Sequence, residues 1–286
     1  MPNMSRRVHI AVVQPPAVGS DMPHTVMRDR AVELLDEAGA RGADIICLPE
    51  YLNAMGRDEA MWQEPPGIEA EPLQTEVAEL ARRHSTYVIL PLLAGDNGRI
   101  TNTSFLLDRS GAVVGRYDKT HLTAVEREDQ NVCPGDDYPV FDVDFGRIGI
   151  MTCYDGHFPE VARILALQGA EVIFFPTLQR RLTAEALDLQ VRCRAIDNCV
   201  YVARASYGTP EGIAWVPGMV AGKSCIVDFE GTALADTGPR VGVASTTIDL
   251  DRPRVKERSF GGQVGDAAQF LRQDRRPDTY GRLLEP

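Results

Sequence analysis

The segment 147–177 constrains the fold more than any other part of the chain, because it has the pattern of a strand, a sharp turn, a helix and a second strand. Polarity alternates at its start, which is typical of a pleated strand. Pro159 suits the first turn of a helix, Gly169 suits its end, and 172–175 is an apolar run typical of a strand buried on both faces. Cys153 therefore falls at the carboxyl end of a strand, just before a helix.

This position of Cys153 indicates chemistry. Open α/β sheets carry their functional groups at the carboxyl ends of strands. Free N–H groups and the helix dipole at a helix amino terminus favour a thiolate. The alternative is a buried cysteine that acts as a small hydrophobic side chain, which is commoner for cysteines in general. The position favours a reactive thiol.

Strands and helices alternate in both halves of the chain, without a linker, a repeat or a low-complexity tract, which favours one α/β domain over 1–286. The tail 251–286 is charged and loses the apolar periodicity, so its aromatic residues are candidates for packing on a partner subunit. The pattern predicts helices over 25–40, 73–81, 159–168 and 183–198, and strands over 8–13, 44–48, 87–93, 104–107, 112–117, 140–143, 147–152, 172–175, 200–205, 224–229 and 242–250.

Composition narrows the class of protein. A net charge of −11 argues against a nucleic-acid or anionic-membrane surface, both of which need clustered lysine and arginine. No apolar run approaches the length that crosses a bilayer, and no signal peptide is evident. The six cysteines are scattered, unlike those of a secreted disulfide scaffold. We therefore expect a soluble cytoplasmic protein with free thiols.

Three residues occupy comparable positions at strand ends. Glu50 follows the strand 44–48, Lys119 follows 112–117, and Cys153 follows 147–152. A thiolate is a nucleophile, and a nearby carboxylate can take its proton and pass it to a leaving amine. A lysine ammonium can stabilise the oxyanion that forms when a carbonyl is attacked. Either charged residue alone would be an ordinary surface charge, but the joint pattern favours a catalytic site.

The motifs around these residues resemble the nitrilase, or carbon–nitrogen hydrolase, superfamily, and the resemblance covers nearly the whole chain. It rests on LPE (48–50), YDKTHL (117–122), CYD-x-x-FPE (153–160), GAEVIFFPT (169–177) and RRPDTYGRL (275–283). The resemblance implies an α/β fold, a four-layer αββα sandwich. It also implies a Glu–Lys–Cys triad that hydrolyses amides, carbamoyl groups or nitriles through a covalent thioester or thioimidate.

Matched residue by residue, the resemblance implies that Glu50 is the general base and acid, Lys119 the oxyanion stabiliser and Cys153 the nucleophile. Members also use a second glutamate before the Pro-Gly turn. Glu128, six residues before Pro134, fits that place, and neighbouring Glu126 is a rival. The backbone N–H of Tyr154 would be the other oxyanion donor.

Candidate substrate contacts lie on the same edge as Cys153. His157 could touch substrate, or it could be a solvated residue at the start of a helix. Arg181, with Arg180, could clamp a substrate carboxylate through bidentate hydrogen bonds, and the alternative is a pair of solvated charges opening a helix. Trp215 could line the pocket or simply pack.

The sequence predicts a cofactor-free amidohydrolase without a metal site, since its histidines and cysteines lack zinc-ligand spacing. The expected substrate is a small linear amide or an N-carbamoyl compound, whose hydrolysis releases ammonia or an amine. One alternative is a nitrilase, disfavoured because Tyr154-Asp155 stands where nitrilases usually carry Trp-Glu. Another is a catalytically idle member that serves as a binding protein. The resemblance further implies a homodimer or a larger homo-oligomer.

Overall fold

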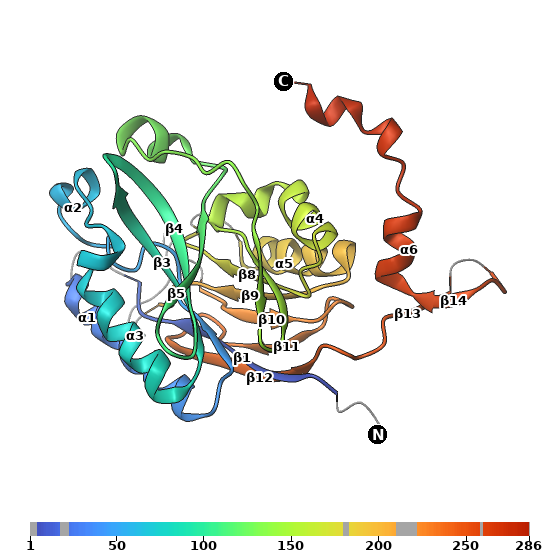
Figure 1. The fold of residues 1–286 in the computed structure, drawn as a ribbon, viewed down its shortest axis with the longest axis horizontal. Helices are drawn as coiled ribbons and strands as arrows, with labels where there is room; N and C mark the ends of the chain where they lie inside the picture. The colour runs from blue at the N-terminus through green and yellow to red at the C-terminus, as the bar shows by residue number, and fades with distance from the viewer. Residues whose placement is uncertain (1–4, 18–22, 180–182, 210–221, 258–259, 286) are drawn as a thin grey trace.

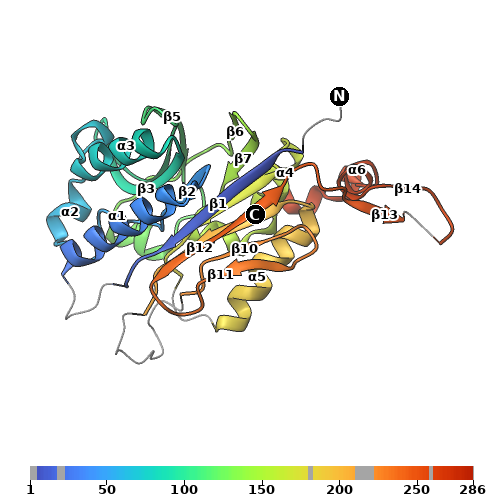
Figure 2. The same cartoon turned by 90° about the horizontal axis from the view of Figure 1, so that it is seen from below.

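The computed structural model describes residues 5–17, 23–179, 183–209, 222–257 and 260–285. Two large β-sheets pack face to face, and helices cover the outer face of each sheet (Figures 1 and 2). This is the predicted αββα sandwich, and the fold class is confirmed.

The first sheet has the strand order β12-β1-β2-β3-β4-β5. Its strands are β1 (Arg7–Gln14), β2 (Ile45–Cys47), β3 (Tyr87–Asp96), β4 (Arg99–Leu107), β5 (Val113–Asp118) and β12 (Gly242–Asp249). Strands β1, β2 and β3 are parallel, whereas β4 is antiparallel to both β3 and β5, so β5 runs in the direction of β3. The covering helices are α1 (His24–Ala40) and α3 (Pro72–His84).

The second sheet has the strand order β11-β10-β9-β8-β7-β6. Its strands are β6 (Val140–Val143), β7 (Gly146–Ile150), β8 (Val172–Pro176), β9 (Tyr201–Ala205), β10 (Cys225–Val227) and β11 (Ala233–Asp236). Strands β7, β8 and β9 are parallel. The covering helices are α4 (Pro159–Leu167), with Pro159 in its first turn as expected, and α5 (Ala184–Asn198).

The period of two along the central strands explains the layers. In β1, Ile10 faces the other sheet, where it packs in one cluster with Phe174. Its neighbour Ala11 faces the helices and packs in one cluster with Leu34 of α1. Because successive side chains of a strand point to opposite faces, one apolar strand contributes to two hydrophobic layers.

The remaining elements are short. They are α2 (Glu59–Gln63), η1 (Ile68–Ala70), a π-helical turn η2 (Val125–Asp129), a 3₁₀ turn η3 (Cys153–His157), β13 (Val255–Glu257), β14 (Val264–Asp266), α6 (Ala267–Gln273), η4 (Pro277–Thr279) and η5 (Gly281–Leu284). The sequence pattern did not predict these pieces, or β11. Elements this short do not establish a periodicity that can be read from sequence.

The tail from β13 onward projects from the end of the molecule opposite α2 (Figures 1 and 2). Arg272 of α6 donates to the carbonyl of Ala166 in α4 at 2.6 Å. That the chain forms a single domain whose tail packs on a partner stays a prediction. Among the described helices, none combines the length and the apolar character needed to span a bilayer.

Candidate active site

The two sheets bring the predicted strand ends to one place. Glu50 lies just beyond β2, Lys119 directly follows β5, and Cys153 follows β7. Strands β2 and β5 end at the same edge of their sheet, because they run in the same direction. The structure brings all three side chains to the wall of one cavity, as expected. Their catalytic roles stay a prediction.

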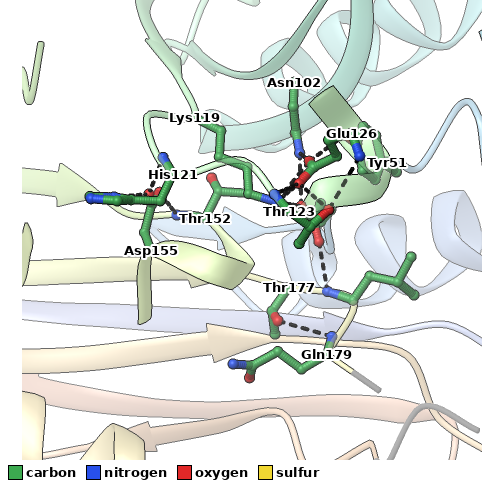
Figure 3. Close-up of polar contacts among 12 residues, drawn as sticks. Tyr51, Asn102, Lys119, His121, Thr123, Glu126, Thr152, Asp155, Thr177 and Gln179 are labelled. Carbon is green, nitrogen blue, oxygen red and sulfur yellow. Dashed lines mark hydrogen bonds and ion pairs between the residues drawn. The ribbon is translucent and has the colours of Figure 1, made fainter. Parts of the chain in front are cut away.

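Lys119 is held between two carboxylates. Its ammonium Nζ lies 2.9 Å from Oε1 of Glu50, and 2.8 and 2.9 Å from the two oxygens of Glu126. The side chains of Lys119 and Glu50 are each 1% exposed. Asn102 donates to both carboxylates, at 2.8 Å to Glu50 and 3.0 Å to Glu126. Figure 3 shows Asn102, Lys119, Glu126 and Tyr51 pointing toward one another.

The second glutamate beside the lysine is Glu126, and the structure corrects the placement expected for Glu128. The Glu128 side chain is 70% exposed and lies 3.9 Å from Arg127. Glu126 is buried, and its carboxylate accepts from the backbone N–H and the hydroxyl of Thr123 at 2.7 and 2.9 Å. The turn η2 therefore directs residue 126 inward and residue 128 toward solvent, which the spacing before Pro134 did not predict.

The charges of this cluster stabilise one another. Burial disfavours the charged ammonium of Lys119, but the neighbouring carboxylates of Glu50 and Glu126 outweigh it, so the pKa of Lys119 is raised. Burial likewise disfavours the Glu126 carboxylate, but the adjacent ammonium outweighs it and lowers the pKa of Glu126. The lysine is therefore a fixed cation at neutral pH, available to stabilise negative charge nearby.

Cys153 occupies a strained turn. Its φ of 48° lies in the left-handed region, which non-glycine residues rarely adopt and which recurs at functional sites. A capping box holds the turn: the Thr152 side chain accepts from the Asp155 N–H, and the Asp155 carboxylate accepts from the Thr152 N–H at 2.8 Å.

The surroundings of Cys153 disfavour the thiolate that its position in the sequence led us to expect. Enclosure by protein and the nearby Glu50 carboxylate raise the pKa of Cys153 to about 12, against the opposing effect of Lys119. The helix α4 begins only at Pro159, so the 3₁₀ turn η3 separates the sulfur from that amino terminus. Glu50 is one cause of this raised pKa and lines the same cavity as Cys153, so it is the carboxylate placed to take the proton of the thiol.

The cavity has a volume of about 270 Å³. Besides the charged cluster and Cys153, its wall is largely apolar, formed by Tyr51, Met55, Trp62, Val125 and Leu178, with Thr123 and Gln130 as polar members. Leu178 also donates its backbone N–H to Oε2 of Glu50 at 2.9 Å. Such an opening admits a small molecule to the thiol and the ammonium.

Two of the predicted substrate contacts, Tyr154 and His157, stay predictions. The ring of Tyr154 packs against His157 and Phe158, with ring centroids 5.3 Å apart in both pairs, and neither Tyr154 nor His157 is among the described residues of the cavity wall. His157 is exposed. Arg180, Arg181 and Trp215 lie outside the described residues. The oxyanion role expected for the Tyr154 N–H stays a prediction.

Sequence reasoning missed several polar partners of the site. Asn102 lies in the middle of β4, where a strand pattern gives no sign of its role. Tyr51 donates its hydroxyl to Glu126 at 2.6 Å, and its place directly after Glu50 was the available signal. Asp155 was visible in the Cys-Tyr-Asp motif. Within the described ranges, no three His, Cys, Asp or Glu side chains gather as metal ligands do.

Comparisons with known proteins agree with this geometry. Residues 9–256 match the carbon–nitrogen hydrolase family. Nitrilase homolog 2 of Dictyostelium discoideum is 31% identical over 235 residues, which are 77% of this chain and 70% of that protein. Human omega-amidase NIT2 is 31% identical over 232 residues, covering 78% and 83% of the two chains.

A solved amidase from Nesterenkonia sp. shares the fold, with a TM-score of 0.77 at 22% identity over 98% of this chain and 97% of that one. The family match spans most of the sequence, including the strand ends that carry the buried lysine, the two carboxylates and the strained cysteine. The chain therefore belongs to the carbon–nitrogen hydrolase family of the nitrilase superfamily, and it is a hydrolase of carbon–nitrogen bonds other than peptide bonds.

Proposed function

We propose that the protein hydrolyses a small linear amide or N-carbamoyl compound through a thioester on Cys153. The thiol gives its proton to Glu50 while its sulfur bonds to the substrate carbonyl carbon, and the carbonyl oxygen becomes an oxyanion beside Lys119. The carbon–nitrogen bond then breaks, and Glu50 returns the proton to the leaving ammonia or amine. Water, deprotonated by Glu50, attacks the thioester, and the sulfur leaves as it regains a proton.

One observation carries this proposal. The Lys119 ammonium is buried between Glu50 and Glu126, on the wall of the cavity that Cys153 also lines. A buried cation costs free energy unless it is paired, and here two carboxylates and Asn102 form a fixed network around it. A fixed cation beside a thiol and a proton acceptor is an arrangement suited to attack on a polarised carbonyl.

The wall of the cavity favours an uncharged acyl group of modest size. Among the described lining residues, Lys119 is the one cation, and it is already paired with the carboxylates of Glu50 and Glu126. Structures of variants of the Nesterenkonia amidase hold butyramide, or carry the acetamide moiety of fluoroacetamide on the active-site cysteine. These small neutral amides match the chemistry of the wall formed by Met55, Trp62, Val125 and Leu178.

The test is ammonia release from a panel of aliphatic amides, N-carbamoyl compounds and nitriles, with wild-type protein and Cys153→Ala. We expect wild-type protein to release ammonia from neutral short-chain amides or carbamoyl compounds, and Cys153→Ala to be inactive while its thermal midpoint is unchanged. Turnover of nitriles alone would establish a nitrilase instead. Activity retained in Cys153→Ala would show that Cys153 is not the nucleophile. If wild-type protein released no ammonia from any compound of the panel, a binding role would be favoured.

We also propose that the chain is one domain that works as a homo-oligomer in the cytoplasm. Phe260 and Leu284 in the tail are 105% and 90% exposed, which is unusual for large apolar side chains unless a partner covers them. All six cysteines are unpaired, which suits a reducing compartment.

A further inference from the structure

Asp155 has an unusual environment for a carboxylate. Its side chain is 0% exposed, yet Lys119 does not contact it and its nearest partners are neutral hydrogen-bond donors and one histidine. A buried carboxylate is costly unless its oxygens are satisfied. The chain has therefore arranged a dense set of donors around this one group.

The two oxygens of Asp155 bind different segments. Oδ2 accepts from the Tyr117 hydroxyl at 2.6 Å and from the Thr152 N–H at 2.8 Å. Oδ1 accepts from the Thr120 hydroxyl at 3.1 Å and from both the N–H and Nδ1 of His121 at 3.0 Å. Since a carboxylate is an acceptor, the imidazole carries its proton on Nδ1. The ring also stacks on Phe158, with centroids 3.8 Å apart.

These donors bracket the two reactive side chains. Tyr117 precedes Lys119 by two residues, Thr120 and His121 follow it, and Thr152 directly precedes Cys153. One carboxylate thus joins the Tyr117 side chain and the segment 120–121, on either side of the lysine at the end of β5, to the strained turn of the cysteine after β7. In Figure 3, His121, Asp155 and Thr152 meet on the side of the lysine-bearing segment away from Glu126.

We propose that Asp155 is a positioning residue that fixes the distance between the Lys119 ammonium and the Cys153 sulfur. The proposal rests on the proposed function, in which the oxyanion must form between these two groups. A displacement of about 1 Å between such groups can reduce a rate by about 10²-fold. Asp155 does not touch the cavity among the described residues, so it acts through the segments it joins.

Asp155→Asn tests the proposal, because the amide keeps the size of the side chain but replaces one acceptor oxygen with a donor. That donor would face either the Tyr117 and Thr152 groups or the Thr120 and His121 groups. We expect kcat to fall by about 10²-fold with KM within about twofold of wild type, because alignment for attack is lost while the binding wall is intact.

The matched control is Asp228→Asn. Asp228 is another buried aspartate that accepts backbone N–H groups, from Glu230 at 3.0 Å and Thr232 at 2.9 Å, but it lies in the turn between β10 and β11. The Asp228→Asn variant should have a lower thermal midpoint than wild type and an unchanged kcat. An equal fall of kcat in both variants, or a kcat within about threefold of wild type in Asp155→Asn, would overturn the proposal.

Tyr117→Phe keeps the proposal testable if Asp155→Asn does not fold, because it removes one donor from the lysine side and leaves the carboxylate. Its kcat should fall by about tenfold. Adding Tyr117→Phe to Asp155→Asn should cause little further loss, because both changes break one connection and their effects are not additive. Full activity in Tyr117→Phe, or independent additive losses, would contradict a shared positioning role.

A readout without substrate separates this proposal from the proposed function. Iodoacetamide alkylation of Cys153, followed by mass on the tryptic peptide 148–163, needs no turnover, but it depends on the Lys119 ammonium lying close enough to stabilise the thiolate that Glu50 helps to form. Asp155→Asn should slow it by about tenfold at neutral pH, whereas Asp228→Asn should not. An unchanged alkylation rate overturns the positioning role even if amides are hydrolysed, and a slowed rate supports it even if no amide on the panel is a substrate.

Discussion

At the scale of single residues, the site depends on keeping a lysine charged inside the protein. Lys119 is 1% exposed, and its pKa is raised because Glu50 and Glu126 outweigh the penalty of burial. A group whose pKa is raised on folding contributes stability below its unfolded pKa, and that contribution is lost as the pH rises toward the folded value. Glu50 and Glu126 therefore keep the Lys119 side chain charged inside the protein.

The pair Glu126→Gln and Glu128→Gln tests which glutamate serves the site. Glu126→Gln should lower kcat by about 10²-fold and the free energy of unfolding by roughly 2 kcal/mol, because Lys119 loses a charged hydrogen-bond partner. Glu128→Gln, two residues further along the same turn and exposed, should change stability by less than about 0.5 kcal/mol and leave kcat unchanged. Steady-state kinetics and urea unfolding measure both, and a reversed pattern would restore Glu128 to the site.

The protonated thiol gives a prediction on pH. The pKa of Cys153 is raised to about 12 by burial and by Glu50, so the thiol stays neutral across the range in which a free cysteine ionises. The rate of Cys153 alkylation should show no inflection near pH 9, whereas a free cysteine derivative alkylated alongside the protein provides the control and should show one. A midpoint for Cys153 below pH 8 would mean that the thiolate is already formed at rest.

At the scale of elements, the lysine is held by the loop that follows η2. Gly135 donates its N–H to the carbonyl of Lys119 at 2.9 Å, and a Cβ at this position would lie 2.2 Å from the carbonyl oxygen of Asp118. The same loop also bonds β4, through the Cys133 N–H and the carbonyl of Ile100 at 2.7 Å, so it ties the end of β5 to β4. The loop can therefore transmit a small change in packing to the ammonium.

Gly135→Ala should lower both stability and kcat, the latter by about tenfold or more, because the backbone beside Lys119 must shift. Gly242→Ala is the control, since a Cβ on Gly242 meets no atom within 4 Å. Thermal melts and kinetics of the two variants make the comparison. Equal behaviour of the two variants would show that the loop does not position the lysine.

Elements and strand-end residues were predictable to different degrees. Cys153 and Glu50 each follow an apolar strand that the sequence pattern identifies. Since both residues stand at carboxyl ends of strands, their proximity could be predicted. Glu126 could not be chosen over Glu128, because the difference is the direction of side chains in one short π-helical turn. The direction of the pKa shift of Cys153 could not be predicted either, because it depends on burial and Glu50 outweighing Lys119, and because a short 3₁₀ turn stands between Cys153 and helix α4.

At the scale of the whole molecule, the tail is the part that the sandwich does not explain. A cavity of about 410 Å³ lies between the tail and helices α4 and α5, with Arg194 on one side and Tyr280 on the other. The tail contacts its own body through α6, where Phe270 is buried. Its exposed apolar residues lie beyond these contacts, where a second copy of the chain could cover them.

We expect the wild-type protein to sediment as a homo-oligomer and the double variant Phe260→Ser, Leu284→Ser to shift toward monomer, because the apolar area that drives association is lost. Val114→Ser, which alters an exposed valine of β5, is the control and should remain assembled. Sedimentation velocity decides between them. A monomeric wild type, or an assembly that the double variant leaves intact, would refute this role for the tail.

The most direct test of the central claim is the mass of the protein quenched in acid during turnover of an amide substrate. We predict an acyl adduct on the tryptic peptide 148–163, which contains Cys153, and no adduct in Cys153→Ala. An adduct on the peptide containing Cys133, or turnover by Cys153→Ala at the wild-type rate, would contradict it.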